Sequence, residues 1–215
     1  RAEYPDAKRI PLSVNLTARQ FAQPDLVEVV RQALAESGLP PALLKLEITE
    51  SALMDDPEGA LASMRRLKAL GVSLAIDDFG TGYSSLSYLQ RFPVDILKID
   101  RSFVRDLPRE DSDSRELVRA IVALSRSLGL TVVAEGVESR EQLEILAELG
   151  CEAVQGFLFS PPVPPVGVEP LLGHRLAAPG RAVAPAGGIA AAPQAAAAPQ
   201  GELATREGEL DGSQD

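Results

Sequence analysis

The sequence predicts an α/β fold in which parallel strands alternate with helices and curve into an incomplete barrel. Three observations support this prediction. Short aliphatic segments alternate with amphipathic helical segments over residues 11–159, which is the pattern of parallel strands joined by helical crossovers. In the early strands one parity is aliphatic and the other is small or polar. A polar side chain also ends each predicted strand, as expected where a barrel gathers its functional groups at one mouth.

Six segments are predicted to be strands because they are short and rich in aliphatic or β-branched residues. They cover residues 11–16, 43–49, 72–78, 94–100, 131–136 and 151–159. The aliphatic parity of the first two strands consists of Leu12, Val14, Leu16, Leu44, Leu46 and Ile48. The opposite parity consists of Ser13, Asn15, Lys45, Glu47 and Thr49. We expect the aliphatic parity to pack against outer helices and the polar parity to line the inside of a barrel.

Helices are predicted between the strands from apolar spacing and end signals. Four of them cover residues 25–36, 57–70, 84–90 and 115–128. The second begins with Pro57 at its first helical position and stops at Gly71, which is the usual placement of proline and glycine at helix ends. A fifth helix follows Ser139, which forms a capping box with Gln142, and ends at Gly150.

The predicted barrel is incomplete. A (β/α) barrel has eight strands over about 250 residues, so about 60 to 70 further residues are expected before Arg1. We assign residues 1–172 to this partial domain, whose open sheet edges predict low stability in isolation. Residues 173–215 are rich in alanine, proline and glycine, which predicts a disordered tail.

Composition narrows the class of protein. The formal charge of −10 argues against a nucleic-acid duplex and against membrane contact by this segment. The single cysteine, Cys151, excludes an internal disulfide, and we expect it to be a small buried apolar group in a cytoplasmic protein. No apolar run reaches the roughly 18 residues of a membrane-spanning helix, and no signal peptide is visible. The single histidine, His174, lies beside the tail, which disfavours a histidine-based zinc site.

The polar residues at the strand ends indicate a metal site. They are Asn15, Glu47, Asp77 with Asp78, Lys98, Glu135 and Gln155. Each alone is explained by a turn or by solvation, but all six strands supply one. Carboxylates crowded in one mouth repel each other unless a cation lies among them, and an oxygen-only ligand set selects Mg²⁺ or Mn²⁺, with Ca²⁺ as a further candidate. Two such ions about 4 Å apart suit in-line hydrolysis of a phosphodiester, in which Lys98 holds the attacking water or stabilises phosphate charge.

Six motifs in order closely resemble those of the bacterial EAL domain family. They read SVNLTARQF, LKLEITES, AIDDFGTGYSSL, ILKIDRSFV, VVAEGVES and VQGFLFSPP, and the resemblance covers residues 11 to about 165. It implies a TIM-like barrel of the EAL type, with about six of its eight strands present. It also implies the family's activity, which is hydrolysis of cyclic di-GMP to linear pGpG.

The resemblance also implies roles for individual residues. The ligands of two Mg²⁺ or Mn²⁺ ions would be Asn15, Glu47, Asp77, Asp78 and Glu135, with Asp77 bridging the ions. Lys98 would contact the catalytic water, and Glu50 would steady the DDFGTGYSS loop. Glu138 and Gln155 would lie on the substrate side, near the guanine and phosphate of cyclic di-GMP.

Three functional readings remain open at this point. The Glu-Ala-Leu strand that names the family is absent from the sequence, so we expect hydrolysis by a full-length parent and no activity of the fragment itself. The alternative is a catalytically inactive EAL domain that serves as a cyclic di-GMP receptor or signalling scaffold, and the third is a barrel enzyme for another phosphate ester. The resemblance further allows a homodimer, an upstream GGDEF or sensory domain, and upstream segments that anchor the parent to the inner membrane.

Overall fold

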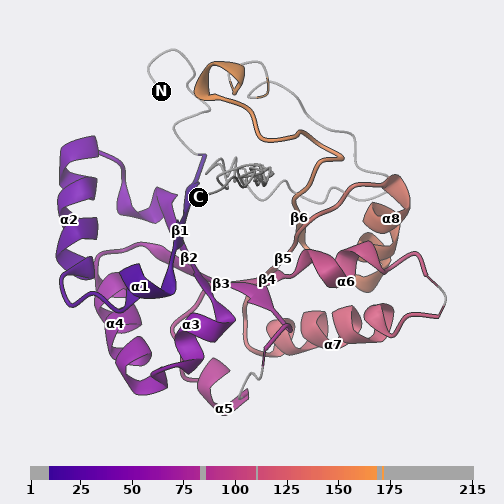
Figure 1. Ribbon diagram of the computed structural model, residues 1–215, viewed down its shortest axis with the longest axis horizontal. Helices are drawn as coiled ribbons and strands as arrows, with labels where there is room; N and C mark the ends of the chain where they lie inside the picture. The colour runs from indigo at the N-terminus through magenta and orange to yellow at the C-terminus, as the bar shows by residue number, and fades with distance from the viewer. Residues whose placement is uncertain (1–9, 83–85, 110, 169–170, 172–215) are drawn as a thin grey trace, which may run out of the picture.

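The structure is a computed structural model that describes residues 10–82, 86–109, 111–168 and 171. Within these ranges six strands form one sheet in chain order, and every neighbouring pair is parallel. The strands are β1 (Leu12–Leu16), β2 (Leu44–Thr49), β3 (Ser73–Phe79), β4 (Ile96–Ile99), β5 (Thr131–Ala134) and β6 (Ala153–Val154). Figure 1 shows the sheet curving with helices on its outer side and an opening between β1 and β6. The α/β fold class is therefore confirmed, and the sheet is that of a TIM-like barrel that is not closed.

Short and long helices alternate with the strands. They are α1 (Ala18–Phe21), α2 (Leu26–Ser37), α3 (Glu50–Met54), α4 (Pro57–Ala69), α5 (Leu86–Leu89), α6 (Arg101–Arg105), α7 (Ser114–Ser127) and α8 (Arg140–Leu149), together with the 3-10 turns η2 (Pro41–Leu43) and η3 (Pro165–Gly167). The predicted helices at α2, α4, α7 and α8 are confirmed to within one or two residues. Part of the predicted helix 84–90 lies outside the described residues. None of the helices in the described ranges combines the length and apolar character needed to span a bilayer.

Three helices were not predicted, namely α1, α3 and α6. Each has only four or five residues and directly follows a strand, so it is too short to show a helical period. The α1 turn carried a signal nonetheless, because Thr17 and Gln20 form a capping box like that of Ser139 and Gln142 in α8.

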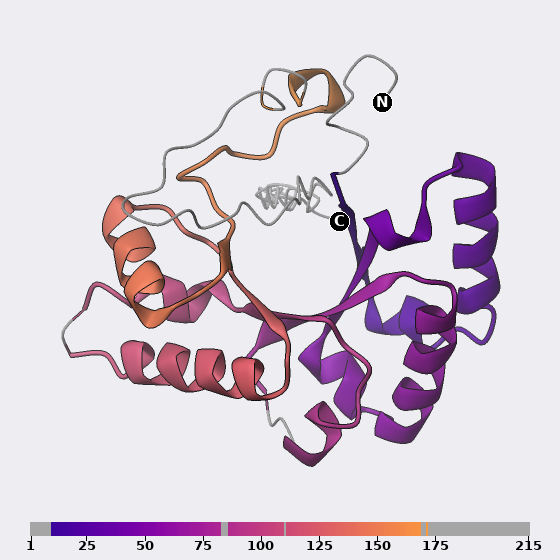
Figure 2. The same cartoon turned by 180° about the vertical axis from the view of Figure 1, so that it is seen from behind.

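The predicted strand 151–159 is wrong in length, since β6 contains only Ala153–Val154. The chain turns immediately after it. The amide of Phe159 donates to the carbonyl of Gly156 (3.1 Å) and the amide of Leu158 donates to the carbonyl of Val137 (2.9 Å). Figure 2 shows the segment after β6 leaving the sheet and continuing toward η3.

The main hydrophobic core lies between the outer face of the sheet and the helices. It includes Leu46 and Ile48 of β2, Leu74 and Ile76 of β3, Leu97 and Ile99 of β4, and Met64 and Leu67 of α4. The prediction that the aliphatic side chains of each strand pack against outer helices is wrong for part of β1, where Leu12 and Val14 remain 46% and 39% exposed. The reason is that β1 is the terminal strand of the sheet, so its outer parity receives little cover from the described helices. A second, smaller apolar cluster lies on the inner face and consists of Ala75, Ile96, Val133 and Ala153.

Asp95 fixes the spacing of three strands at their amino-terminal ends. Its carboxylate accepts hydrogen bonds from the amide of Leu74 (2.8 Å) and from Lys68 Nζ (2.7 Å to each oxygen). Its own amide donates to the carbonyl of Leu74 (3.0 Å), and its carbonyl accepts from the amide of Thr131 (3.0 Å). This one residue therefore ties β3, β4 and β5 together before they reach the opposite edge of the sheet.

Candidate metal centre

Strand register brings the predicted site residues to one edge of the sheet. Asn15 of β1 lies opposite Glu47 of β2, and Asp77 of β3 lies opposite Thr49, two residues further along β2. Glu135 directly follows β5 and its amide donates to the carbonyl of Ile99 at the end of β4 (3.1 Å). Because side chains alternate between the two faces of a strand, each of these groups points to the inner face.

Three carboxylates converge around a buried lysine. Glu47, Asp77 and Glu135 each offer one oxygen, and these oxygens lie within 4.8 Å of one another. Lys98 Nζ lies 2.5 Å from Glu47 Oε2, 2.9 Å from Asp77 Oδ1 and 2.6 Å from Glu135 Oε1. Lys98 and Glu47 are only 4% and 5% exposed. Asp77 and Glu135 are partly buried. The cluster therefore holds three potential negative charges against one positive charge with limited access to water.

The cluster changes the proton affinity of its members. Burial raises the pKa of Glu135 to about 7, Lys98 opposes this shift, and the neighbouring carboxylates of Asp77 and Glu47 add to it. Burial lowers the pKa of Lys98, but the carboxylates of Glu135, Glu47 and Asp77 outweigh burial and raise that pKa above its ordinary value. Lys98 therefore keeps its proton, and Glu135 ionises more readily when further positive charge is supplied.

The side-chain amide of Asn15 lies beside two of these carboxylates, those of Glu47 and Asp77. In one orientation its oxygen faces only acceptor oxygens, which is favourable only with a cation between them. In the other orientation its nitrogen donates to Asp77 Oδ2 (3.3 Å) and Glu47 Oε2 (3.2 Å). The amide oxygen beside Glu47 and Asp77, together with the nearby carboxylate of Glu135, forms the all-oxygen donor set that Mg²⁺ and Mn²⁺ prefer, so the residues present fit a divalent ion.

Asp78 reaches this edge through a break in strand geometry. Adjacent residues of a regular strand point to opposite faces, so Asp77 and Asp78 could not share one side. The pairing of β3 with β4 shifts register between Ile76 and Phe79, and Asp78 has a φ of 54°, a left-handed conformation that is uncommon outside glycine. Burial raises the pKa of Asp78, and the charges of Asp77 and Asp100 raise it further. Asp78 is not among the three residues of the tight set.

Asp100 is a neighbour that sequence reasoning missed. It follows β4 directly and its carboxylate accepts from the amide of Ser102 (2.9 Å) and from the Ser102 hydroxyl. Burial favours its neutral form, but these hydrogen bonds together hold the pKa of Asp100 below its usual value. The available signal was its place just after a strand, which is the place that Glu135 occupies after β5.

Glu50 lies behind the turn that follows β3. It is 1% exposed and its Oε2 accepts from the amide of Gly80 (2.9 Å). The turn passes close to Glu50, since a Cβ added at Gly82 would lie 3.1 Å from Glu50 Oε1. Gly80 has a φ of +98°, and a Cβ there would lie 2.9 Å from the ring of Phe103, so this position requires glycine. Residues 83–85 of the same loop lie outside the described ranges.

A small cavity adjoins the cluster on the inner face. It is lined by Ser13, Lys45, Glu47, Ile96, Lys98, Val133 and Gln155. Gln155 is held by its backbone, because its amide donates to the carbonyl of Ala134 (2.8 Å) and its carbonyl accepts from the amide of Val137 (3.0 Å). Lys45 is half-buried there, and burial lowers its pKa while the charge of Glu47 opposes that shift.

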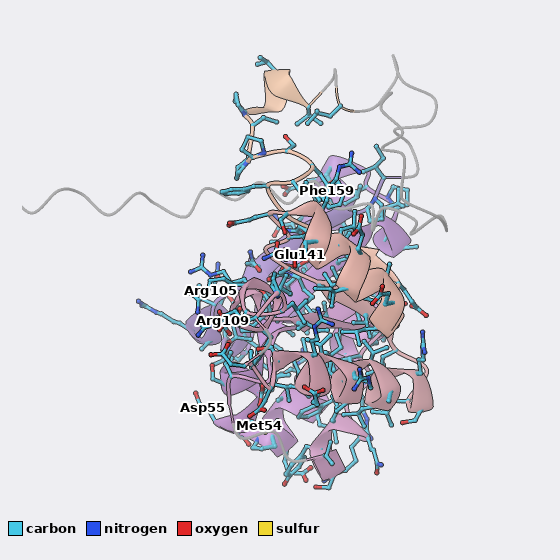
Figure 3. All side chains as sticks on the ribbon, turned by 90° about the vertical axis from the view of Figure 1, so that its right-hand side faces the viewer. Met54, Asp55, Arg105, Arg109, Glu141 and Phe159 are labelled. Carbon is cyan, nitrogen blue, oxygen red and sulfur yellow. The ribbon has the colours of Figure 1, made fainter. Side chains whose placement is uncertain are left out.

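Glu138 is not one of the residues gathered around Lys98. Its side chain is exposed, and its amide donates to Gln142 Oε1 (2.7 Å) at the start of α8. Other charged side chains lie on the outer surface, as Figure 3 shows for Arg105 and Arg109. These two pair with Asp106 and Asp111 at 3.3 Å each.

Together these features define a class of protein. The parallel sheet carries oxygen ligands from neighbouring strands, and a buried lysine lies among them at the carboxyl-terminal edge. This is the arrangement of a barrel-type α/β protein with a candidate divalent-metal centre.

The chain belongs to the EAL domain family, whose model matches residues 2–162. It is 49% identical over 165 residues to the cyclic di-GMP phosphodiesterase NbdA of Pseudomonas aeruginosa, an alignment that covers 77% of this chain and 21% of NbdA. The chain spans about a fifth of the length of the curated relatives it matches.

Solved structures agree with this assignment. The MucR phosphodiesterase of Pseudomonas aeruginosa in complex with c-di-GMP has a TM-score of 0.71 and 51% identity, covering 74% of this chain and 64% of that one. BlrP1 of Klebsiella pneumoniae in a manganese and cyclic di-GMP complex has a TM-score of 0.66 and 37% identity, covering 71% of this chain and 39% of that one.

Proposed function

We propose that this chain forms most of the metal centre of a phosphodiesterase that hydrolyses cyclic di-GMP to linear pGpG. The observation that carries the proposal is the convergence of Glu47, Asp77 and Glu135 around Lys98, with their oxygens within 4.8 Å of one another. The name of the relative NbdA, a cyclic di-GMP phosphodiesterase, supports this substrate. The activity is assigned to the protein that carries this chain, because the chain spans only a fifth of such relatives.

The residues that would hold two Mg²⁺ or Mn²⁺ ions are Asn15, Glu47, Asp77, Asp78 and Glu135. Asp77 would be the ligand that both ions share, since its strand lies between those of Glu47 and Glu135 and Asp78 is next to it in sequence. When bound, two ions activate the attacking water and neutralise charge on the phosphoryl oxygens. The manganese complex of the relative BlrP1 supports this class of ion.

Lys98 acts in this proposal as a fixed cation and not as a base. The surrounding carboxylates raise its pKa, so it keeps its proton at neutral pH. Its three donors are directed at Glu47, Asp77 and Glu135, and a donor given up by a carboxylate that binds an ion would hold the attacking water or a phosphoryl oxygen. Preorganised donors of this kind stabilise charge that develops in a transition state.

The remaining predicted residues act around this centre. Glu50 holds the turn at Gly80 through its hydrogen bond to the Gly80 amide, and thereby positions Asp78 two residues earlier. We assign Gln155 and Glu138 to the substrate side, because Gln155 lines the cavity beside Lys98 and Glu138 is exposed at the end of the loop after β5. A homodimer and an upstream GGDEF or sensory domain stay predictions from the family resemblance.

The test is hydrolysis of cyclic di-GMP by the full-length protein that carries this chain, with Mg²⁺ or Mn²⁺ and with the ions removed by chelator. We expect linear pGpG as the product and a loss of kcat of about 10³-fold or more in Asp77→Asn, because a ligand carboxylate becomes a neutral amide. The matched control is Asp111→Asn at an exposed position, which should leave kcat unchanged. Binding of cyclic di-GMP without hydrolysis would favour the receptor reading, and the absence of both binding and hydrolysis would refute the proposal.

A further inference from the structure

The left-handed conformation of Asp78 needs support from its surroundings. Its φ of 54° lies in a region that residues other than glycine rarely occupy, although aspartate enters it more readily than most. The pairing of β3 with β4 changes register between Ile76 and Phe79. Asp78 lies within this shift, so regular strand pairing does not fix it. The contacts that keep its carboxylate on the side of Asp77 are therefore those of the turn that follows.

Thr81 supplies the contact that closes this turn. Its hydroxyl donates to the carbonyl of Asp78 at 2.8 Å, and its amide donates to the same carbonyl at 3.4 Å. The first distance is usual for an O–H···O hydrogen bond, whereas the second is longer than a usual N–H···O hydrogen bond. The hydroxyl of Thr81 therefore forms the stronger of these two bonds to the Asp78 carbonyl.

Glu50 holds a different part of the same turn. Its Oε2 accepts from the amide of Gly80 at 2.9 Å, and its side chain is buried. Thr81 is exposed, so its side chain can be changed without opening the hydrophobic core. Glu50 thus joins the middle of the turn to the interior of the protein, and Thr81 joins the end of the turn back to Asp78.

We propose that Thr81 is a positioning residue that acts through Asp78 and sets the affinity of the second divalent ion. This inference rests on the proposed two-ion centre. The tight set of Glu47, Asp77 and Glu135 does not include Asp78, so the turn acts on the ion that Asp78 would bind. The apparent affinity of a ligand falls with the population of the binding-competent conformation. Loss of the Thr81 hydroxyl therefore weakens the second ion by letting Asp78 leave that conformation.

Two other roles for Thr81 predict different results. A side chain that contacts the substrate would change the KM for cyclic di-GMP at saturating Mn²⁺ and would leave ion binding unaltered. A side chain that only stabilises the fold would change the melting temperature and would leave the affinities of both ions unaltered. A positioning role alone separates the second ion from the first.

The experiment uses the full-length protein that carries this chain. Free Mn²⁺ is followed by electron paramagnetic resonance during a titration with Mn²⁺ alone, and kcat for cyclic di-GMP is measured as a function of Mn²⁺ concentration. Thr81→Val removes the hydroxyl and keeps the shape of the side chain, whereas Thr81→Ser keeps the hydroxyl. Thr131→Val removes a hydroxyl from an exposed residue at the amino-terminal end of β5 and serves as the matched control.

We expect Thr81→Val to raise the Kd of one of the two Mn²⁺ sites by about five- to tenfold, as for the loss of one hydrogen bond. The Mn²⁺ concentration that gives half of the maximal kcat should rise by the same factor. The Kd of the other site and the kcat at saturating Mn²⁺ should match the wild type. Thr81→Ser and Thr131→Val should retain all wild-type values, and Thr81→Ala replaces Thr81→Val if that variant does not fold.

Wild-type affinity for both ions in Thr81→Val, or an equal loss at both sites, would overturn the inference while leaving the metal centre in place. The same weakening in Thr81→Ser would also overturn it, because the hydroxyl would not be the cause. A wild-type protein that neither takes up Mn²⁺ nor hydrolyses cyclic di-GMP would overturn the proposed function and the inference with it. The two failures are therefore distinguishable within one data set.

Discussion

At the scale of single residues, Lys98 explains how three carboxylates can be buried together. Isolated buried charges are strongly unfavourable, and Lys98 provides ion pairs of 2.5 to 2.9 Å to all three. The negative charge is only partly neutralised, because one ammonium group lies among three carboxyl groups. Burial raises the pKa of Glu135 to about 7, and the charges of Asp77 and Glu47 add to this shift while Lys98 opposes it.

The stability of the metal-free chain should therefore fall as the pH rises from about 4.5 to 7. Burial raises the pKa of Glu135 from 4.5 to about 7, so the folded chain binds this proton more tightly than the unfolded chain. The resulting contribution to the free energy of unfolding is fully present below pH 4.5 and is lost as the pH rises through 7. Urea unfolding between pH 4.5 and 8 measures it.

The control for this pH dependence is Glu135→Gln, which cannot ionise. Its free energy of unfolding should change less with pH over the same range than that of the wild type, whatever its absolute stability. If the free energy of unfolding changed equally with pH in the two chains, ionisation of Glu135 would not be the cause of the pH dependence. Mg²⁺ should flatten the wild-type slope, because a bound cation favours the ionised carboxylate.

At the scale of elements, the position of the site depends on how the strands are staggered. Asp95 ties β3, β4 and β5 at their amino-terminal ends, and Lys98 follows it by three residues on β4. The register of β4 against its neighbours therefore determines whether Lys98 lies level with Asp77 and Glu135 along the strand direction. This link joins a structural residue at one end of the sheet to the candidate centre at the other.

Asp95→Ala should destabilise the chain by about 1–2 kcal/mol, since it removes the ion pair with Lys68 and the hydrogen bond to the Leu74 amide. This value is discounted for solvent screening, because the Asp95 side chain is 39% exposed. Asp95→Asn should cost less, because an amide oxygen can still accept from Leu74. Urea unfolding of the two variants beside Asp111→Ala, an exposed control, measures the difference. Equal stability of all three variants would contradict the role of Asp95 in holding β3, β4 and β5 together.

The limits of sequence prediction also appear at this scale. The helices α2, α4, α7 and α8 were predictable, because each is long enough to show a period and carries clear end signals. The turn after β6 was not, because the apolar run QGFLF resembles a strand. Its end is set by a tertiary contact, since a Cβ at Gly156 would lie 2.1 Å from the carbonyl of Val137. Asp100 carried a local signal in its place just after β4, but its influence on the pKa of Asp78 is a tertiary interaction that the sequence does not show.

The residues that form the candidate site were easier to predict from the sequence than their arrangement in space. Polar residues at the ends of parallel strands must meet at one edge, so the grouping of Asn15, Glu47, Asp77, Lys98 and Glu135 follows from the sequence pattern. The sequence could not show that Lys98 would pair with three carboxylates at once, or that Asp78 would adopt a φ of 54°. Both depend on the stagger and on the register shift of β3.

At the scale of the whole molecule, the sheet is a curved segment that stays open between its terminal strands (Figure 1). Leu12 and Val14 are exposed on β1, and the polar groups of the centre come from β1 to β6 and the residues that follow them. The carboxyl-terminal edge therefore carries the candidate metal centre, whereas the hydrogen bonds and ion pair of Asp95 lie at the amino-terminal edge. A (β/α) barrel is expected to place its functional site at the first of these edges and stabilising residues at the second.

The measurement that most directly tests this account is anomalous diffraction from crystals of the protein grown with Mn²⁺. The account predicts two manganese peaks at the carboxyl-terminal edge of the sheet, bound by oxygens of Asn15, Glu47, Asp77, Asp78 and Glu135, with one oxygen ligand shared between them. Crystals that show no manganese among these side chains, or show it only at surface carboxylates such as Asp111, would contradict the central claim.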